Sequence, residues 1–485
     1  MDQRLGRSAY VNGRWEKSGA SETIAVVNPA TEVVLANATA GCGEDVDKAV
    51  TAARSAFDRW SQVPLEERVE LLRRVSAGIA SHAEELASTI TSEMGSPIGF
   101  SRRAQIGLPL GDIKATLEAA AELNDRVLGR SIVQNDPIGV VGAITPWNFP
   151  LHQIVAKVAP ALVAGCTVVL KPSEVTPLDA VLLAEIFHEA GAPAGVFNLV
   201  LGGRETGQAL ASHPGIDMIS FTGSTRGGRE VAKMAAMGLK KVALELGGKS
   251  ANIILDDADL EKAIPASLGQ ALGNCGQVCA ALSRLIVPEH KRQKIEELAI
   301  EAAKDWKLGD PMDPATRLGP LSSLSQQARV RQAITGAIAE GANLLTGGAE
   351  QPRTQPKGAY VAPTILSSVA PAMAIAREET FGPVLSIIGY SDDDEAIRIA
   401  NDSDYGLSGG VWSGDDDRML TVARRMRTGQ VILNGAPFDL AAPFGGVKLS
   451  GIGRENGLYG LEEYFAPKAI THHHAPVIPL EEKKE

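Results

Sequence analysis

VVGAITPWNFPLHQIVAKVAPALVAGCTVVLK, residues 140–171, contains two short apolar runs with a longer apolar stretch between them. The runs at 140–144 and 167–171 have the length and character of buried strands. The stretch from Ile154 to Leu170 is interrupted by Lys157 and Pro160 and is too short to cross a bilayer comfortably. We interpret it as a helix that runs into a buried strand. A strand, a helix and a second strand in succession predict a parallel sheet.

The same alternation continues on both sides of this segment, and a second series follows it. The first series is completed by strands at 196–200 and 218–222 and by helices at 46–60, 65–80, 178–190 and 227–237, with a break at Gly95 before further helix to Gly111. The second series has strands at 251–255, 284–287, 384–388 and 431–433. The predicted fold class is α/β, with two parallel-sheet domains. Ligands are expected beyond the carboxyl ends of the strands.

Composition limits the possible partners. A chain of 485 residues exceeds the size at which one core stops growing, so two or three domains are expected. The formal charge of −11, with no dense Lys/Arg block before the last few residues, argues against nucleic acid and against an anionic membrane surface. The first eight residues contain no apolar stretch, so we expect no secretory signal or membrane anchor and a cytoplasmic location. A small molecule is the expected partner.

Four cysteines in so long a chain do not form a disulfide framework, so reduced thiols are expected: Cys42, Cys166, Cys275 and Cys279. The spacing of Cys275 and Cys279 matches neither a zinc ribbon nor a redox pair, and no second Cys/His pair supports a metal site. No metal is therefore predicted. We interpret the run His472–His474 as an exposed tail feature.

An isolated carboxylate and an isolated thiol lie in glycine-rich sequence: Glu245 in LELGGK, residues 244–249, and Cys279 in GQVC, residues 276–279. A thiolate can attack a carbonyl carbon, and a carboxylate can later deprotonate the water that releases a thioester. The alternative is that Cys279 is one more small buried cysteine and Glu245 part of a solvated turn, which is the usual fate of both residue types. Without further motifs, that alternative would be preferred.

Six further motifs accompany this pair: TPWNFP (145–150), KPSE (171–174), FTGS (221–224), EETFGP (378–383), PFGG (443–446) and SGIGRE (450–455). The complete set closely resembles the NAD(P)-dependent aldehyde dehydrogenase superfamily, over a range from about Tyr10 to Ile470. The sequence as a whole is similar to a bacterial branch of this superfamily that contains degradative semialdehyde and aromatic aldehyde dehydrogenases.

The resemblance implies the aldehyde dehydrogenase-like fold, with two Rossmann-like parallel-sheet domains and a small β oligomerisation segment. The implied NAD-binding domain comprises residues 1–117 and 137–247, and the catalytic domain comprises residues 248–447. The oligomerisation segment would comprise residues 118–136 and 462–471. A homodimer or homotetramer is expected.

The resemblance also implies a catalytic set. Cys279 would be the nucleophile, and Glu245 would be the base in both thiol activation and thioester hydrolysis. The Asn148 amide would stabilise the oxyanion of the thiohemiacetal. Lys157 would support the catalytic glutamate from beneath. Glu455 is a second supporting candidate, and its alternative is an ordinary ion pair with Arg454.

The implied cofactor is NAD. Residues 223–228 follow a predicted strand and open a helix, where backbone N–H groups and the helix dipole can hold a pyrophosphate. By resemblance, Lys171 and Glu174 bind the adenosine ribose, and a carboxylate there should repel the 2′-phosphate of NADP. Arg226 is a counter-signal, because an arginine can accept that phosphate. The predicted cofactor-binding residues are Thr145, Pro146, Trp147, Lys171, Ser173, Glu174, Gly203, Gly207, Phe221, Thr222, Gly223, Ser224, Leu246, Glu379 and Phe381.

The substrate is expected to be a bulky aromatic or long-chain aldehyde. Two positions aligned with aromatic residues in the family are Ala156 and Gly273 here, which suggests a wide tunnel. The predicted wall residues are Phe149, Gln153, Val278, Ala280, Phe438 and Phe444. Two other functions remain open at this point. A cofactor-free thiol hydrolase or acyltransferase would leave Lys171, Glu174 and Glu379 unexplained, and a non-catalytic binding protein would tolerate loss of Cys279 and Glu245.

Overall fold

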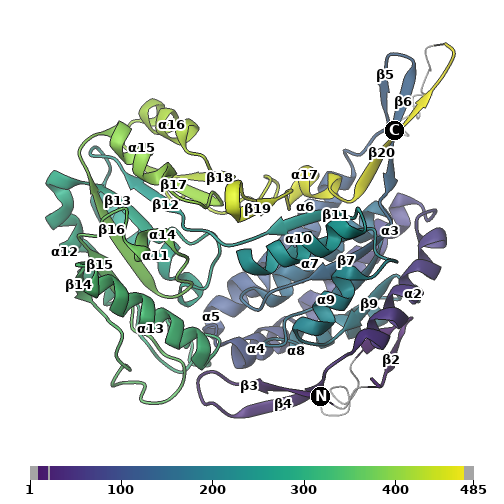
Figure 1. Cartoon of the computed structure of the whole chain (residues 1–485), viewed down its shortest axis with the longest axis horizontal. Coiled ribbons are helices and arrows are strands. Elements are labelled where there is room, and N and C mark those ends of the chain that lie inside the picture. The colour runs from purple at the N-terminus through teal and green to yellow at the C-terminus, as the bar shows by residue number, and fades with distance from the viewer. Residues whose placement is uncertain (1–8, 20–21, 475–485) are drawn as a thin grey trace.

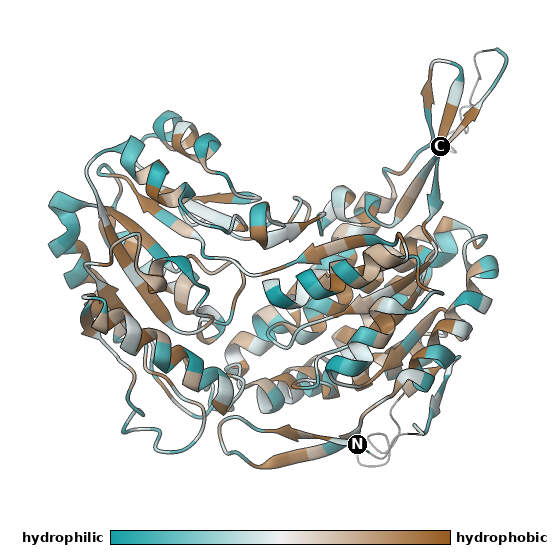
Figure 2. Ribbon diagram, viewed as in Figure 1, coloured by the Kyte–Doolittle hydropathy of each residue, from teal (hydrophilic) through white to brown (hydrophobic). Residues whose placement is uncertain are grey.

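The computed structural model of the chain describes residues 9–19 and 22–474, and residues 1–8 of the predicted NAD-binding domain lie outside this range. Two large sheets covered by helices lie side by side, and a small three-stranded sheet projects from one corner (Figure 1). Hydrophobic residues are concentrated in the strands, while the outer helices carry many hydrophilic ones (Figure 2). No helix in the described part of the chain is long and apolar enough to cross a membrane.

The first sheet contains the predicted strands at its centre. Its order is β19-β11-β10-β7-β8-β9-β1-β2, and the five strands from β11 to β9 are parallel. The strands are β1 (Ala9–Val11), β2 (Arg14–Glu16), β7 (Val140–Ile144), β8 (Thr167–Lys171), β9 (Phe197–Val200), β10 (Met218–Thr222), β11 (Lys241–Glu245) and β19 (Gly451–Ile452). From β7 the chain adds β8 and β9 on one side and then returns to add β10 and β11 on the other. The carboxyl ends of β7 and β10 therefore flank a crevice of the kind that binds ligands.

Helices pack on both faces of this sheet, as the alternation predicted. They are α2 (Gly43–Trp60), α3 (Leu65–Ser81), α4 (Ala83–Met94), α5 (Ile98–Phe100), the π-helical turn η1 (Ser101–Gln105), α6 (Gly107–Ala120), α7 (Pro150–Ala164), α8 (Leu178–Glu189), α9 (Arg204–Ser212), α10 (Thr225–Met237) and α17 (Gly457–Glu462). Every residue of α7 is buried, which explains its unbroken apolar sequence. It starts with Pro150, where a missing N–H is harmless, and ends at Gly165 with φ +95°.

The second sheet has the order β14-β15-β16-β13-β12-β17-β18 and is parallel except for β14. Its strands are β12 (Ala251–Ile254), β13 (Arg284–Pro288), β14 (Asn343–Thr346), β15 (Thr364–Ser367), β16 (Val384–Tyr390), β17 (Ser408–Trp412) and β18 (Gln430–Leu433). Its helices are α11 (Leu260–Leu272), α12 (Arg292–Ala303), α13 (Leu324–Ala339), α14 (Ala374–Arg377), α15 (Asp393–Asn401) and α16 (Asp416–Arg425), with short turns η2 (Gly273–Gly276), η3 (Glu289–Lys291) and η4 (Lys448–Ser450). Three strands of this sheet, β14, β15 and β17, had no counterpart in the sequence prediction.

Two smaller sheets complete the fold. The projecting sheet has the order β20-β6-β5 and joins chain segments more than 300 residues apart (Figure 1). Its strands are β5 (Arg126–Leu128), β6 (Ser131–Pro137) and β20 (Phe465–Thr471), which come from the two stretches predicted for oligomerisation. Its role in assembly stays a prediction. A separate hairpin pairs β3 (Thr23–Val27) with β4 (Val34–Thr39).

Two fully buried carboxyl groups meet where α4 packs against the start of α8. The Glu93 carboxylate accepts the N–H groups of Leu178 at 2.9 Å and Asp179 at 3.3 Å, so it satisfies donors at the beginning of α8. Burial raises the pKa of Glu93 well above its usual range, and the neighbouring Asp179 adds to this. Burial also raises the pKa of Asp179, to about 7. The folded state therefore holds protons that the unfolded chain releases above about pH 4.

We expect Asp179→Asn to make the stability of the protein less sensitive to pH. Because the folded pKa of Asp179 lies above its unfolded value, wild-type stability should fall as pH rises from about 4 to about 7. The amide cannot ionise, so the variant should lose fewer degrees of melting temperature than wild type between pH 5 and pH 8. Thermal unfolding followed by circular dichroism measures this. Asp58→Asn, at an exposed position, should follow the wild-type slope, and an equal slope for Asp179→Asn would contradict the prediction.

Candidate active site

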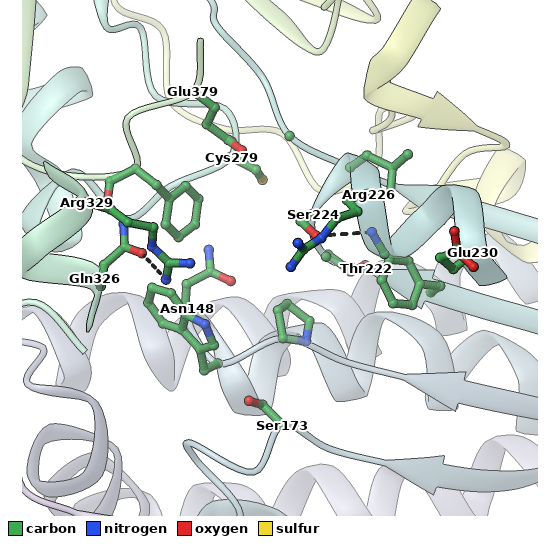
Figure 3. Close-up of a pocket in the computed structure, with 18 of the residues that line it drawn as sticks. Asn148, Ser173, Thr222, Ser224, Arg226, Glu230, Cys279, Gln326, Arg329 and Glu379 are labelled. Carbon is green, nitrogen blue, oxygen red and sulfur yellow. Dashed lines mark hydrogen bonds between the residues drawn. The ribbon is translucent and has the colours of Figure 1, made fainter. Parts of the chain in front are cut away.

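A cavity of about 900 Å³ opens at the carboxyl ends of β7, β8 and β10 and is closed on its other side by residues of the second sheet's domain. Figure 3 shows Cys279 and Glu379 on one side of it and Asn148 on the opposite side, with Arg329 and Arg226 at the flanks. The structure brings together every residue predicted to bind the cofactor. Those lining the cavity are Thr145, Pro146, Trp147, Lys171, Ser173, Glu174, Gly203, Gly207, Phe221, Thr222, Gly223, Ser224, Leu246, Glu379 and Phe381.

Cys279 is presented by a tight turn after α11. Asn274 and Cys275 have φ values of +51° and +58°, in the left-handed region that glycine prefers. At Gly276, with φ +71°, an added Cβ would lie 2.0 Å from the carbonyl oxygen of Gly382, so only glycine fits there. The thiol of Cys279 is half-buried and lines the cavity. All four cysteines are unpaired, as predicted.

Asn148 lies at the start of α7, against the cysteine turn. Its Nδ2 donates to the carbonyl oxygen of Gln277 at 3.0 Å, two residues before Cys279. Its own carbonyl oxygen accepts from Gln105 Nε2 at 3.0 Å and from Asn274 Nδ2 at 2.8 Å. An amide nitrogen carries two hydrogens, so one donor remains for the cavity that Asn148 lines.

Glu245 ends β11 and is only 4% exposed. Neither carboxylate oxygen has a hydrogen-bond partner among the described residues, and Oε1 lies 2.6 Å from the position of a Cβ at Gly445. Burial raises its pKa well above the usual range, and the charge of Glu455 raises it further. Unlike Cys279 and Asn148, Glu245 does not line the cavity.

Lys157 lies on α7 and is almost completely buried. Its Nζ donates to Thr222 Oγ1 at 2.6 Å and forms an ion pair with Glu455. Glu455 thus pairs with Lys157. The alternative considered from the sequence was an ion pair between Glu455 and Arg454. Lys157 reaches Glu245 only through its charge, which lowers the pKa of Glu245 against the larger effect of burial.

The pKa of the Cys279 thiol is raised, first by burial and then by the negative charges of Glu245, Glu379 and Glu455. These effects disfavour the thiolate in the protein alone and do not activate the nucleophile by a lowered pKa. A base is then needed for attack, and Glu245 is close enough to act on the thiol electrostatically.

At the other end of the cavity, the residues leave space and donors for a dinucleotide. Ser224 caps α10, with its Oγ accepting the N–H of Gly227 at 3.2 Å. A Cβ at Gly203 would meet no atom within 4 Å, so the backbone there is open to the cavity. Lys171 Nζ donates to the carbonyl oxygen of Gly202 at 2.9 Å and lies 3.5 Å from Glu174 Oε2. A helix N-terminus beside an open glycine edge suits a pyrophosphate.

The loop with Glu379 and Phe381 is fixed at several points. Glu379 Oε1 accepts the N–H of Gly248 at 3.0 Å, and burial raises the pKa of Glu379 to about 7. The carbonyl oxygen of Phe381 accepts from Gln326 Nε2 at 2.8 Å, and Phe381 has φ +54°. Its ring packs edge-on against Trp147, with centroids 5.4 Å apart. Glu379 therefore ties this loop to the segment that follows β11.

The six side chains predicted to contact the substrate do not line this cavity: Phe149, Gln153, Val278, Ala280, Phe438 and Phe444. Val278 and Ala280 flank Cys279 in the chain, and Phe149 is packed 6.0 Å from Phe100. Phe438 and Phe444 pack edge-on at 5.6 Å. The substrate role of these residues stays a prediction.

Several cavity residues had no sequence signal. Gln326 and Arg329 lie on α13 and are hydrogen-bonded at 2.7 Å (Figure 3). Arg204 and Glu230 lie on α9 and α10. Gly203 was predicted to bind the cofactor, and Arg204 follows it in the chain. No motif indicated α13, because this helix reaches the cavity only through the packing of the two domains.

Two Rossmann-like sheets with a thiol in the cavity between them are typical of a dehydrogenase, and the comparisons with known proteins give the family. The model of the aldehyde dehydrogenase family matches residues 15–470, and the chain belongs to that family. A 3-succinoylsemialdehyde-pyridine dehydrogenase from a Pseudomonas species is 50% identical over 472 residues, covering 96% of this chain and 98% of that protein.

Solved structures agree with this assignment and confirm the predicted fold class. A cysteine-to-alanine variant of aldehyde dehydrogenase C from Pseudomonas syringae, complexed with NAD⁺ and octanal, superposes with a TM-score of 0.96 at 46% identity, covering 97% of each chain. A Mycobacterium tuberculosis aldehyde dehydrogenase complexed with NAD⁺ has a TM-score of 0.95 at 41% identity, covering 97% of this chain and 99% of that one.

We expect alkylation of Cys279 by iodoacetamide to accelerate about tenfold per pH unit between pH 7 and pH 9. Because the pKa of the thiol is raised above this range, its ionised fraction should rise in proportion to hydroxide over the whole interval. Peptide mass spectrometry follows the reaction, with Cys279→Ala reporting the background from the other thiols. A rate that levels off below pH 8 would show a thiolate already present at neutral pH.

Proposed function

We propose that this chain oxidises an aldehyde to the carboxylic acid, with NAD as hydride acceptor. The observation that carries the proposal is the convergence of the Cys279 thiol, the Asn148 amide and the dinucleotide residues on one cavity. A hydrolase would have no use for the open glycine edge and capped helix at Gly203 and Ser224. The NAD⁺ bound in the related structures supports the choice of cofactor.

The chain's own residues account for the covalent steps. Cys279 loses its proton to Glu245, directly after a side-chain rotation or through a water, because Glu245 does not line the cavity. The thiolate adds to the aldehyde carbon, and the free N–H of Asn148 donates to the oxyanion of the thiohemiacetal. Once the hydride has left the substrate carbon, Glu245 releases the thiol proton to solvent; it then takes a proton from the water that attacks the thioester and returns it to the Cys279 sulfur as the acid leaves. The buried, unpartnered carboxylate of Glu245 suits both transfers, since a raised pKa makes the carboxylate a stronger base.

The cofactor would be held from both domains. Ser224 and the start of α10 would take the pyrophosphate, Lys171 and Glu174 the adenosine ribose, and Glu379 and Phe381 the nicotinamide end. When bound there, the nicotinamide supplies an acceptor for the hydride that leaves the substrate carbon. Gln326 fixes the loop that would hold this ring.

The substrate we propose is a bulky aromatic or long-chain semialdehyde. Ala156 and Gly273 are small, and a Cβ at Gly273 would meet only Phe100, at 3.9 Å, so the approach beside the cysteine turn is wide. The pyridine semialdehyde after which one relative is named and the octanal bound in a related structure are both of this size class. A homodimer or homotetramer in the cytoplasm, with a role in catabolism, completes the proposal.

NADH formation by wild type and Cys279→Ala tests the proposed function directly. Purified protein is assayed with NAD and with short, long, aromatic and carboxylate-bearing aldehydes. We expect long and aromatic aldehydes to be favoured and Cys279→Ala to lose at least about 10³-fold in kcat, because nothing else in the cavity can form the thiohemiacetal. NAD binding by the variant, measured by calorimetry, should stay within about twofold, since no cofactor contact is removed. Undiminished turnover by the variant, or no turnover by NAD-binding wild type, would overturn the proposal.

Glu174→Gln should shift the cofactor preference toward NADP. Glu174 lies beside Lys171 at the adenosine end, and removal of its charge ends the repulsion of a 2′-phosphate while Arg226 remains. We expect the ratio of kcat/KM for NADP to that for NAD to rise about tenfold. Glu189→Gln, at the exposed end of α8, is the matched control and should leave the ratio unchanged. An unchanged ratio in Glu174→Gln would assign the preference to other groups.

A further inference from the structure

A buried glutamine outside the sequence motifs contacts the residue that would stabilise the oxyanion. Gln105 ends the π-helical turn η1, shortly before α6, and is completely buried. Its Nε2 donates a hydrogen bond to the carbonyl oxygen of Asn148 at 3.0 Å. Gln105 does not line the cavity, and the chemical steps proposed above do not use it.

The orientation of the Gln105 amide follows from its surroundings. Its Oε1 has no hydrogen-bond partner among the residues that the structure describes. Rotation of the amide by half a turn would bring this oxygen against the carbonyl oxygen of Asn148, and two acceptors cannot bond. It would also take the donor away from Met94 Sδ, which lies 3.7 Å from Nε2. The nitrogen therefore faces Asn148, and the oxygen is left without a partner.

This arrangement does not favour stability. A buried acceptor without a partner destabilises a folded protein, whereas an apolar side chain of similar shape at the same place would not. Unsatisfied groups of this kind are few in native proteins, and each needs an explanation. Packing alone does not explain the amide of Gln105. The hydrogen bond that it donates to Asn148 does.

Two amides from different domains converge on the carbonyl oxygen of Asn148. Gln105 reaches it from the first domain, and Asn274 Nδ2 reaches it at 2.8 Å from the turn that presents Cys279. The Asn148 side chain bonds back to the same turn, because its Nδ2 donates to the carbonyl oxygen of Gln277 at 3.0 Å. Gln105 is thus the contact that ties this asparagine to the helices of its own domain.

The position of the Asn148 backbone determines where its side chain points. One hydrogen of Nδ2 is used by Gln277, so the other is the donor available to an oxyanion. Such a donor lowers the barrier only if it is aimed at the oxygen before the reaction begins. A displacement of about 1 Å in a reacting group can cost about 10²-fold in rate. Small movements of this backbone should therefore be felt in the chemical step.

Resting on the proposed function, we propose that Gln105 is a positioning residue for the oxyanion donor. Its hydrogen bond fixes the backbone of Asn148 so that the free N–H of the side chain points at the thiohemiacetal oxygen. Gln105 touches neither the substrate nor the cofactor and acts only through Asn148. Without it, Asn274 alone would hold the carbonyl oxygen, and the asparagine would follow the cysteine turn.

The test compares full-length wild type with Gln105→Met, which replaces the amide by an apolar side chain of similar length. We expect kcat for octanal oxidation with saturating NAD to fall about tenfold. Hydrolysis of 4-nitrophenyl acetate should fall by a similar factor, because the same thiol forms an oxyanion there without NAD. Alkylation of Cys279 by iodoacetamide forms no oxyanion, so its rate should stay within about twofold of wild type. The melting temperature should not fall, since the variant also removes the unpartnered oxygen.

A double-mutant cycle with Asn148→Ala separates positioning from packing. If Gln105 acts through the Asn148 amide, Gln105→Met should change kcat by less than about twofold once that amide is absent. Gln293→Met, at an exposed position on α12, is the matched control and should leave every rate unchanged. Gln105→Leu takes the place of Gln105→Met if the methionine variant does not fold.

Three results would overturn this inference alone: an unchanged kcat in Gln105→Met, equal losses in oxidation and alkylation, or an undiminished effect of Gln105→Met in the Asn148→Ala background. A different result would overturn the proposed function and leave the role of Gln105 standing. In that case wild type would form no NADH with any aldehyde, while Gln105→Met would still hydrolyse the ester more slowly at an unchanged rate of alkylation.

Discussion

The close passage of one backbone segment, residues 246–250, between the two large sheets is the constraint on which the site depends. This segment joins the end of β11 directly to β12. A Cβ at Gly247 would lie 2.3 Å from Glu379 Oε2, and one at Gly248 would lie 2.5 Å from the carbonyl oxygen of Cys279. At Gly248 the neighbouring atom is backbone, so only glycine permits the approach, and a side chain at Gly247 would displace the Glu379 carboxylate. Gly247 and Gly248 therefore allow the Glu379 carboxylate and the Cys279 backbone to lie against the segment that follows Glu245.

Burial of so many acids in one place determines their protonation. Glu245, Glu379 and Cys279 all have raised pKa values, with burial as the first cause in each case. Lys157 lowers the pKa of Glu245 and Lys249 lowers that of Glu379, but burial outweighs both. A carboxylate with a raised pKa is a stronger base than an ordinary glutamate, which favours transfer of the thiol proton to Glu245.

Local sequence was sufficient for much of the fold. The strands at 140–144, 167–171 and 218–222 have the predicted bounds, because each is a buried apolar run between clear breaks. β17, with the sequence SGGVW, was missed because two glycines give no strand signal, and its burial comes from the neighbours on both sides. The residues predicted to bind the cofactor all line one cavity, and their role in cofactor binding stays a prediction. Gln326 could not be found, because its hydrogen bond to Phe381 depends on how α13 packs across the domain boundary.

Helix α7 unites the proposed chemistry and the proposed substrate selection, and this explains how one fold serves different aldehydes. Its first turn begins beside Asn148, one of its faces has Phe149 and His152, and Lys157 lies a turn further on. Every residue of the helix is buried. A change of side-chain volume at the substrate face therefore shifts the whole helix, and with it the position of Lys157. Substrate selection can therefore change only through substitutions that keep the volume and the helix, such as exchange of one buried side chain for another of similar size.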